Sequence, residues 1–233
     1  MSKTSLSKSS FIKGLQCPKQ LWFYKNCYDQ RDPVSPQLDA VFRFGHEIGE
    51  LATRLFPGGR MLCCDDLSQA EQVATTQRWI AEGATTIYEA AFSAQGVFAR
   101  VDILHRGTAG WEIFEVKSAT RVKPVFVQDL ALQAWVLRQV GLTVSTAGLI
   151  TLKCYQLPDP TDLARQFAIH DLTRDVDDLQ AFVGLQIAGM QAMLSQSGPP
   201  PVEAGQQCVT PYRCSFHGYC HQNSEAKNDG QAA

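Results

Sequence analysis

The sequence predicts an α/β fold, and three observations support that prediction. Apolar residues recur every three or four positions in the first third of the chain, which is typical of amphipathic helices. From residue 87 onward the pattern changes to short β-rich runs, two of which flank a turn-rich stretch. An apolar helix and further strands follow that hairpin. We therefore expect a core sheet flanked by helices, preceded by a helical segment.

Five segments have helical periodicity or composition. They are residues 5–24, 38–55, 68–82, 125–140 and 171–194. Cys17-Pro18 should break the first, because proline disrupts a helix interior, and Pro57-Gly58-Gly59 ends the second. In the last segment we expect Phe182, Leu185, Ile187 and Met190 to pack inward.

Five segments read as strands: residues 87–92, 97–104, 111–117, 146–155 and 166–170. The stretch 105–110 between the second and third suits an antiparallel hairpin. If its turn is centred between Thr108 and Ala109, Asp102 lies directly opposite Glu115, at the roughly 5 Å Cβ separation of cross-strand neighbours. Two carboxylates at that separation repel each other unless a cation lies between them.

Composition limits the possible classes of protein. The chain has 233 residues, 45% of them hydrophobic, a formal net charge of −2 and a pI of about 6.2. It can bury a full core, and its overall charge gives no sign of a polyanion partner. No apolar run reaches the roughly 20 residues of a membrane span, and no apolar signal stretch follows Met1, so we expect a cytoplasmic protein.

Cysteines cluster at the two ends of the chain. Cys17 stands near the start, and Cys208, Cys214 and Cys220 close the chain with five residues in each gap. In a reducing compartment such a set more often binds metal than forms disulfides, and thiolates suit either zinc or an iron-sulfur cluster. His217 is an alternative zinc ligand. Four other cysteines are expected to be small buried hydrophobes: Cys27, Cys63, Cys64 and Cys154.

Asp102 and the run Glu115-Val116-Lys117 have the spacing of a divalent-metal nuclease site. Carboxylates suit magnesium or manganese, and the Val116 carbonyl is a candidate third ligand. Glu115 and Lys117 share one strand face because side chains alternate. Lys117 would either supply positive charge or, with a depressed pKa, accept a proton. A surface salt bridge is the competing interpretation of this pattern.

Two polar residues interrupt the apolar helix that follows. Asp129 and Gln133 are four positions apart and therefore lie on one helical face. Polar side chains in so apolar a segment need a reason.

The chain resembles the PD-(D/E)xK nucleases of the RecB and Cas4 type, in particular the Cas4-like proteins of DUF2779, from about Ser5 to Cys220. The segments that carry the resemblance are Leu15-Gln16-Cys17-Pro18-Lys19-Gln20-Leu21-Trp22, Ala99-Arg100-Val101-Asp102-Ile103-Leu104, Glu115-Val116-Lys117-Ser118, Asp129-Leu130-Ala131-Leu132-Gln133-Ala134 and the terminal cysteines. It implies a restriction-endonuclease-like core sheet flanked by helices, with N- and C-terminal arms joined by a metal cluster.

The resemblance also assigns roles. It implies Asp102 and Glu115 as metal ligands, Lys117 as the catalytic lysine and Gln133 as the glutamine that follows the core strands. It further implies a [4Fe-4S] cluster on Cys17, Cys208, Cys214 and Cys220.

The sequence departs from the family pattern on the early helix. Such enzymes usually carry Gly-x-x-x-His there, whereas Gly45-His46-Glu47-Ile48-Gly49 has glycine in the histidine slot. His46 and Glu50, four positions apart on one face, are the candidate replacements as a metal ligand. The Cys-x5-Cys-x5-Cys spacing also has a longer first gap than is general in Cas4.

We therefore expect one nuclease domain over residues 1–220, with a helical arm at 1–85, a core at 86–156, a C-terminal helix and cysteine cluster at 157–220, and a disordered tail at 221–233. The expected function is Mg²⁺- or Mn²⁺-dependent cleavage of DNA, as an exonuclease on single-stranded ends. DNA repair and CRISPR-adaptation proteins are candidate partners. The alternatives are an inactive module of the same fold that binds nucleic acid or a partner nuclease, and a zinc-stapled scaffold.

Overall fold

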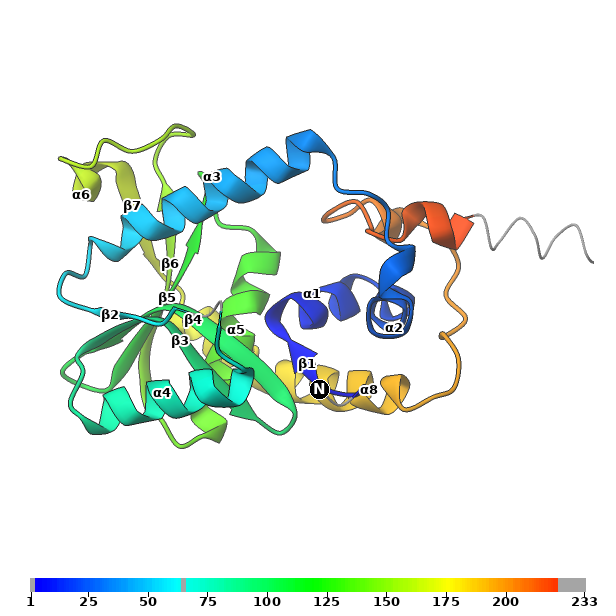
Figure 1. The fold of residues 1–233 in the computed structure, drawn as a ribbon, viewed down its shortest axis with the longest axis horizontal. Coiled ribbons are helices and arrows are strands. Elements are labelled where there is room, and N and C mark those ends of the chain that lie inside the picture. Colours follow the sequence, from blue (N-terminus) through cyan, green and yellow to red (C-terminus); the bar gives the residue numbers. More distant parts are fainter. Residues whose placement is uncertain (1–2, 64–65, 222–233) are drawn as a thin grey trace, which may run out of the picture. The chain divides into compact units, whose positions relative to one another are not determined.

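A computed structural model describes residues 3–63 and 66–221 (Figure 1). These residues pack as two compact units. We call residues 36–184 the sheet unit, and residues 3–35 together with 185–221 the terminal unit. The two ends of the chain thus pack with each other, whereas residues 36–85, predicted as part of an N-terminal arm, pack with the sheet.

The terminal unit begins with strand β1 (Leu6–Ser7), helices α1 (Lys8–Gln16) and α2 (Pro18–Asn26) and the 3₁₀ turn η1 (Tyr28–Gln30). Ser7 caps α1 through a capping box with Ser10. The chain breaks at Cys17 as predicted, because its backbone is extended and Pro18 then starts α2, where its missing N–H costs no helical bond. The unit also contains the second half of α8 (Gln180–Leu194) and the 3₁₀ turn η2 (Gln206–Cys208).

The sheet unit contains α3 (Pro36–Thr53), β2 (Arg60–Met61), α4 (Gln69–Ala81), β3 (Thr86–Ala94), β4 (Val97–Arg106), β5 (Trp111–Lys117), α5 (Pro124–Gln139), β6 (Val144–Leu152), α6 (Leu163–Gln166), β7 (Phe167–Asp171), α7 (Thr173–Asp178) and the start of α8. The strands follow the order β2-β3-β4-β5-β6-β7. β3, β4 and β5 form an antiparallel meander, α5 crosses over to the parallel strand β6, and β7 returns antiparallel. The expected α/β class is confirmed.

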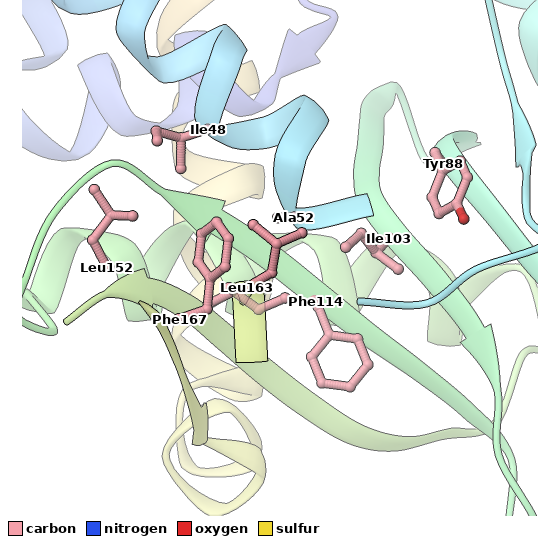
Figure 2. Close-up of a cluster of buried hydrophobic side chains, with 9 residues drawn as sticks. Ile48, Ala52, Tyr88, Ile103, Phe114, Leu152, Leu163 and Phe167 are labelled. Carbon is pink, nitrogen blue, oxygen red and sulfur yellow. The ribbon is translucent and has the colours of Figure 1, made fainter. Parts of the chain in front are cut away.

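Helices α3 and α5 cover opposite faces of this sheet. Ile48 and Ala52 of α3 pack in one apolar cluster with Phe114 of β5 and with residues of β3, β4, β6 and β7 (Figure 2). Glu115, the next residue along β5, bonds instead to Gln133 of α5. Because consecutive strand residues point to opposite faces, the acidic strand positions face α5.

The hairpin register is the one predicted from the turn. Ile103 pairs with Phe114, Leu104 with Ile113, and His105 with Glu112. The next positions in this register are Asp102 and Glu115. The regular ladder between the two strands ends at Ile103 and Phe114.

The predicted long helix over 171–194 is wrong in one respect, because it is two helices, α7 and α8, separated at Leu179. The side-chain amide of Gln180 bonds to the Val176 carbonyl at 2.9 Å and to Ala131 on α5 at 3.2 Å. The break shifts the helical phase. Ile187 and Met190 are buried as expected, but Leu185 is 74% exposed and Phe182 36% exposed, while Val183 is buried.

Among the helices of residues 3–63 and 66–221, none combines the length and the apolar content that a membrane span requires. The predicted tail at 221–233 falls, except for His221, outside the described residues, as does Cys64.

Candidate active site and cysteine cavity

The Asp102 carboxylate takes a backbone donor on the neighbouring strand. Its Oδ2 accepts a 2.8 Å hydrogen bond from the N–H of Val116 on β5. Asp102 is therefore bonded to the backbone of Val116, whose carbonyl is the other predicted ligand of this segment.

The Lys117 ammonium lies between two carboxylates. Its Nζ donates to Glu115 Oε1 at 2.6 Å and to Asp129 Oδ2 on α5 at 2.7 Å. Glu115 is 3% exposed and Asp129 is 7% exposed, so both charges are largely removed from water. Nζ also lies 5.6 Å from the centre of the Phe126 ring, which shields one side of the group. The acid-x-lysine motif thus forms a buried ionic cluster and not a surface salt bridge.

The charges of this cluster set the ionisation of Lys117. Burial alone would lower the lysine pKa, but the negative charges of Glu115, Asp129 and Asp102 outweigh burial and hold the pKa well above its ordinary value. Two carboxylates therefore bond one largely buried ammonium, and the charge of a third, Asp102, also acts on it. Of the two roles predicted for Lys117, this arrangement fits the supply of positive charge.

Gln133 holds the other oxygen of the central glutamate. Its Nε2 donates to Glu115 Oε2 at 2.7 Å and lies 3.4 Å from the Asp129 carbonyl, one turn earlier on α5. Its Oε1 is buried and accepts no hydrogen bond from any described residue. Such an acceptor costs free energy unless something supplies a donor, and a water or a ligand in the site would supply it. Gln133 therefore orients Glu115 directly, and not the lysine.

The sequence identified Asp129 only as a companion of Gln133. The structure makes it a member of the site, since it is the second carboxylate bonded to Lys117. The signal was present in the sequence, because Asp129 shares a helical face with Gln133.

The candidate replacements for the missing histidine, His46 and Glu50, are both exposed on α3. The helix does pass the end of β5, since a Cβ on Gly45 would lie 3.7 Å from Ser118 Oγ. The role of His46 as a metal ligand stays a prediction.

The four predicted cluster ligands line a single cavity in the terminal unit. Cys17, Cys208, Cys214 and Cys220 all border one cavity, which has a volume of about 20 Å³ and is partly open to solvent. The wall is fixed by polar contacts between the two ends of the chain. Gln16 Nε2 donates to the carbonyls of Gln207 at 2.7 Å and Tyr212 at 2.6 Å, and Lys19 Nζ donates to that of Val202 at 3.3 Å.

The thiols of this cavity affect one another. The pKa of Cys214 is raised to about 11, first by burial and in smaller part by the neighbouring Cys17, Cys208 and Cys220. The Phe216 N–H bonded to its sulfur has a smaller, opposing effect. Four soft thiol donors around one cavity suit zinc or an iron-sulfur cluster. Among the side chains of residues 3–63 and 66–221, no three His, Cys, Asp or Glu residues form a group that could hold a metal ion.

The remaining cysteines differ from the expectation. Cys63 and Cys154 are exposed and Cys27 is half-buried, so the expectation that they would be buried hydrophobes is wrong for the first two. Both lie in irregular segments beyond a strand end, where no core covers them. His217 borders the cysteine cavity, and its ring stacks on His221 at 4.3 Å between centroids.

Comparison with known proteins adds little. No protein-family pattern matches the chain, and no curated protein does. One solved structure, described as "Crystal structure of SSO0001", overlaps 87% of this chain and 81% of its own with 13% identity and a TM-score of 0.36. A similarity of that extent supports no argument about fold or function.

Proposed function

We propose that this chain is a divalent-metal-dependent deoxyribonuclease acting on single-stranded or free DNA ends, with a structural [4Fe-4S] cluster on its four terminal cysteines. The observation that carries the proposal is the buried bonding of Lys117 to Glu115 and Asp129, with the Asp102 carboxylate held on the neighbouring Val116 N–H. The resemblance to RecB- and Cas4-type nucleases implies Asp102 and Glu115 as metal ligands and Lys117 as the catalytic lysine.

The donor set fits magnesium or manganese. Carboxylate and carbonyl oxygens are the ligands that these hard cations prefer, and the cluster carries more negative than positive charge in a space with little water. Asp102, Glu115 and the Val116 carbonyl would hold the ion, and the buried Gln133 Oε1 provides an acceptor beside them. When bound, the ion would polarise the phosphate and activate the attacking water.

The chain's own groups perform the remaining work. Lys117 donates to two carboxylates, and the same N–H groups can donate to a phosphate oxygen as negative charge develops on it. Gln133 and the Val116 N–H keep Glu115 and Asp102 in fixed orientations, so little reorganisation is needed when substrate arrives. Asp129 holds the lysine when no phosphate is present.

Binding of DNA without cleavage is the second candidate function. The exposed positions of His46 and Glu50 favour it, because the site then lacks the ligand that active relatives take from this helix. The same fold and cysteine set would clamp nucleic acid or a partner nuclease.

The decisive experiment is degradation of end-labelled single-stranded DNA by anaerobically purified protein with Mn²⁺ or Mg²⁺. Asp102→Ala and Lys117→Ala should each lower the rate by about 100-fold or more, as removal of groups that stabilise a transition state does. Asp175→Ala and Lys153→Ala, at exposed positions outside the site, are the matched controls and should retain full activity. If the native chain and both site variants are equally inactive but bind DNA, the non-cleaving function replaces the nuclease.

A further inference from the structure

Positive charge is concentrated in the first part of the terminal unit. Residues 3–35 contain six lysine and arginine residues and two acidic ones, a formal charge of +4. Residues 36–184 contain 13 basic and 18 acidic residues, a formal charge of −5. The composition of the whole chain therefore conceals a basic segment. Such a segment in an otherwise acidic protein is the electrostatic pattern of a surface that binds a polyanion.

Two of these cations lie against tyrosine rings where α2 leads into η1. Lys13 Nζ lies 4.9 Å from the centre of the Tyr24 ring, and Arg31 Cζ lies 3.4 Å from the centre of the Tyr28 ring. The two rings meet edge to face, with their centroids 5.3 Å apart. Lys13, Tyr24, Tyr28 and Arg31 thus form one continuous series, which we call the aromatic–cation stack.

The inner part of this stack is fixed to the core of the terminal unit. Tyr24 packs against a buried apolar cluster that contains Phe23 and Phe216. The Arg31 Nε donates to the Tyr28 carbonyl at 3.1 Å, which holds the guanidinium over the ring of the same residue. A ring and a guanidinium that are already held in place lose little conformational freedom when a ligand binds.

The outer part of the stack is open to solvent. Tyr28 is 46% exposed, and Arg31 is exposed as well. Burial first, and the charge of Arg31 second, lower the pKa of Lys13, against an opposing effect of Cys214. The two cations therefore repel each other, and an anion bound beside them would relieve that repulsion. The stack thus offers a flat surface for a base and positive charge for a phosphate.

We propose that single-stranded DNA binds the aromatic–cation stack, with an unpaired base stacked on Tyr28 and Arg31 and the adjoining phosphates neutralised by Arg31 and Lys13. Unpaired bases expose the ring faces that such a surface needs, whereas the bases of a duplex are already stacked on one another. The inference rests on the proposed function for the choice of DNA as the partner, but binding can be measured without any cleavage.

The test measures the Kd of a labelled oligothymidylate in EDTA, where no divalent metal supports cleavage. An abasic oligomer of the same length, which has the phosphates but no bases, is the comparison ligand. Tyr28→Ala should weaken binding of the oligothymidylate about 10-fold, which is within the range for loss of one stacked base, and should leave binding of the abasic oligomer within about twofold. Tyr28→Phe keeps the ring and should bind both oligomers as the native chain does.

Two substitutions of Arg31 separate charge from stacking. Arg31→Lys keeps the charge but has no planar face, so the oligothymidylate should bind about threefold or more weakly with an unchanged dependence on salt. Arg31→Ala should in addition lower the slope of log Kd against log salt by about 0.7, the value for one phosphate contact on a single strand. An unchanged slope in Arg31→Ala would overturn the contact with phosphate.

Tyr212→Ala is the matched control. Tyr212 is also 46% exposed and belongs to the same unit, but it is not a member of the stack. This variant should leave both affinities within about twofold of the native values. Unchanged oligothymidylate binding in Tyr28→Ala overturns the proposal, and so does an equal loss with both oligomers. If Tyr28→Ala unfolds at a lower urea concentration than the native chain, Tyr28→Leu, which keeps apolar contact but has no ring, takes its place.

The outcomes also separate this inference from the proposed nuclease. If the native chain binds the oligothymidylate through Tyr28 but does not degrade it with Mn²⁺, the nuclease is removed and the aromatic–cation stack is supported. If the chain degrades single-stranded DNA and Tyr28→Ala has the native Kd and KM, the nuclease is supported and the role of the stack is overturned.

Discussion

The amide Nε2 of Gln133 on α5 lies 2.7 Å from Glu115 Oε2 on β5, and both residues are almost completely buried. Gln133→Leu keeps the volume but leaves one glutamate oxygen without its donor. We expect a loss of about 1–3 kcal/mol in the free energy of unfolding, measured by urea denaturation. Gln139→Leu, at the exposed end of the same helix, should change stability by less than about 0.5 kcal/mol. Equal effects of the two substitutions would contradict the buried bond.

Lys117→Met removes the positive charge that pairs with both Glu115 and Asp129. Breaking a buried ionic cluster by removing one partner typically costs about 3–5 kcal/mol, and we expect that loss at neutral pH. The buried carboxylates then have pKa values above their unfolded values, so the variant should regain stability as the pH falls and protons neutralise them. In the native protein the pKa of Lys117 is raised, so Lys117 should keep its contribution to the free energy of unfolding until the pH rises above the ordinary lysine range. Parallel pH–stability curves for the two proteins would show that the carboxylates are not coupled to Lys117.

Thiol reactivity should divide the cysteines by burial. Cys63 and Cys154 are exposed, whereas Cys17 and Cys214 are buried, and burial foremost raises the pKa of Cys214 to about 11. In the metal-free protein at pH 8, iodoacetamide should therefore modify Cys63 and Cys154 first and Cys214 last, as mass spectrometry of digested samples can follow. All should react at similar rates in urea. Early modification of Cys214 in the folded chain would contradict its burial.

The two proposed metal sites should be separable. Anaerobic protein should contain about four iron and four sulfide ions per chain, and Cys208→Ala should lose them while Cys154→Ala retains them. EDTA should stop DNA cleavage without loss of iron or a change in the unfolding temperature. If the analysis finds zinc without sulfide, the four cysteines form a zinc site and not an iron-sulfur cluster. If EDTA removes iron and cleavage together, the two sites do not have separate roles.

The parts of the fold that depend on neighbouring residues were predictable from the sequence. The turn residues between β4 and β5 gave the register that aligns Ile103 with Phe114, and the strand β5 begins and ends where its pattern predicted. The break at Cys17-Pro18 followed from proline geometry. In each case a local rule was sufficient.

What depends on distant contacts was not predictable. The break at Leu179 coincides with a bond from Gln180 to the Ala131 carbonyl on α5, a distant contact that no periodicity records. The pairing of Asp129 with Lys117 requires the helix and the strand to meet at one rotation of α5. The left-handed conformation of Glu89 has no local signal either, since glutamate has little intrinsic preference for it.

The terminal unit, assembled from residues 3–35 and 185–221, sets an order of events during protein synthesis. Its first half leaves the ribosome long before its second half is translated, whereas the sheet unit is continuous and complete by residue 184. The nascent chain can therefore fold its sheet unit before residues 208–220, which carry three of the four terminal cysteines, have been made. Assembly of the proposed iron-sulfur cluster would then follow translation of those residues, and Cys17 would be open to oxidation in the interval.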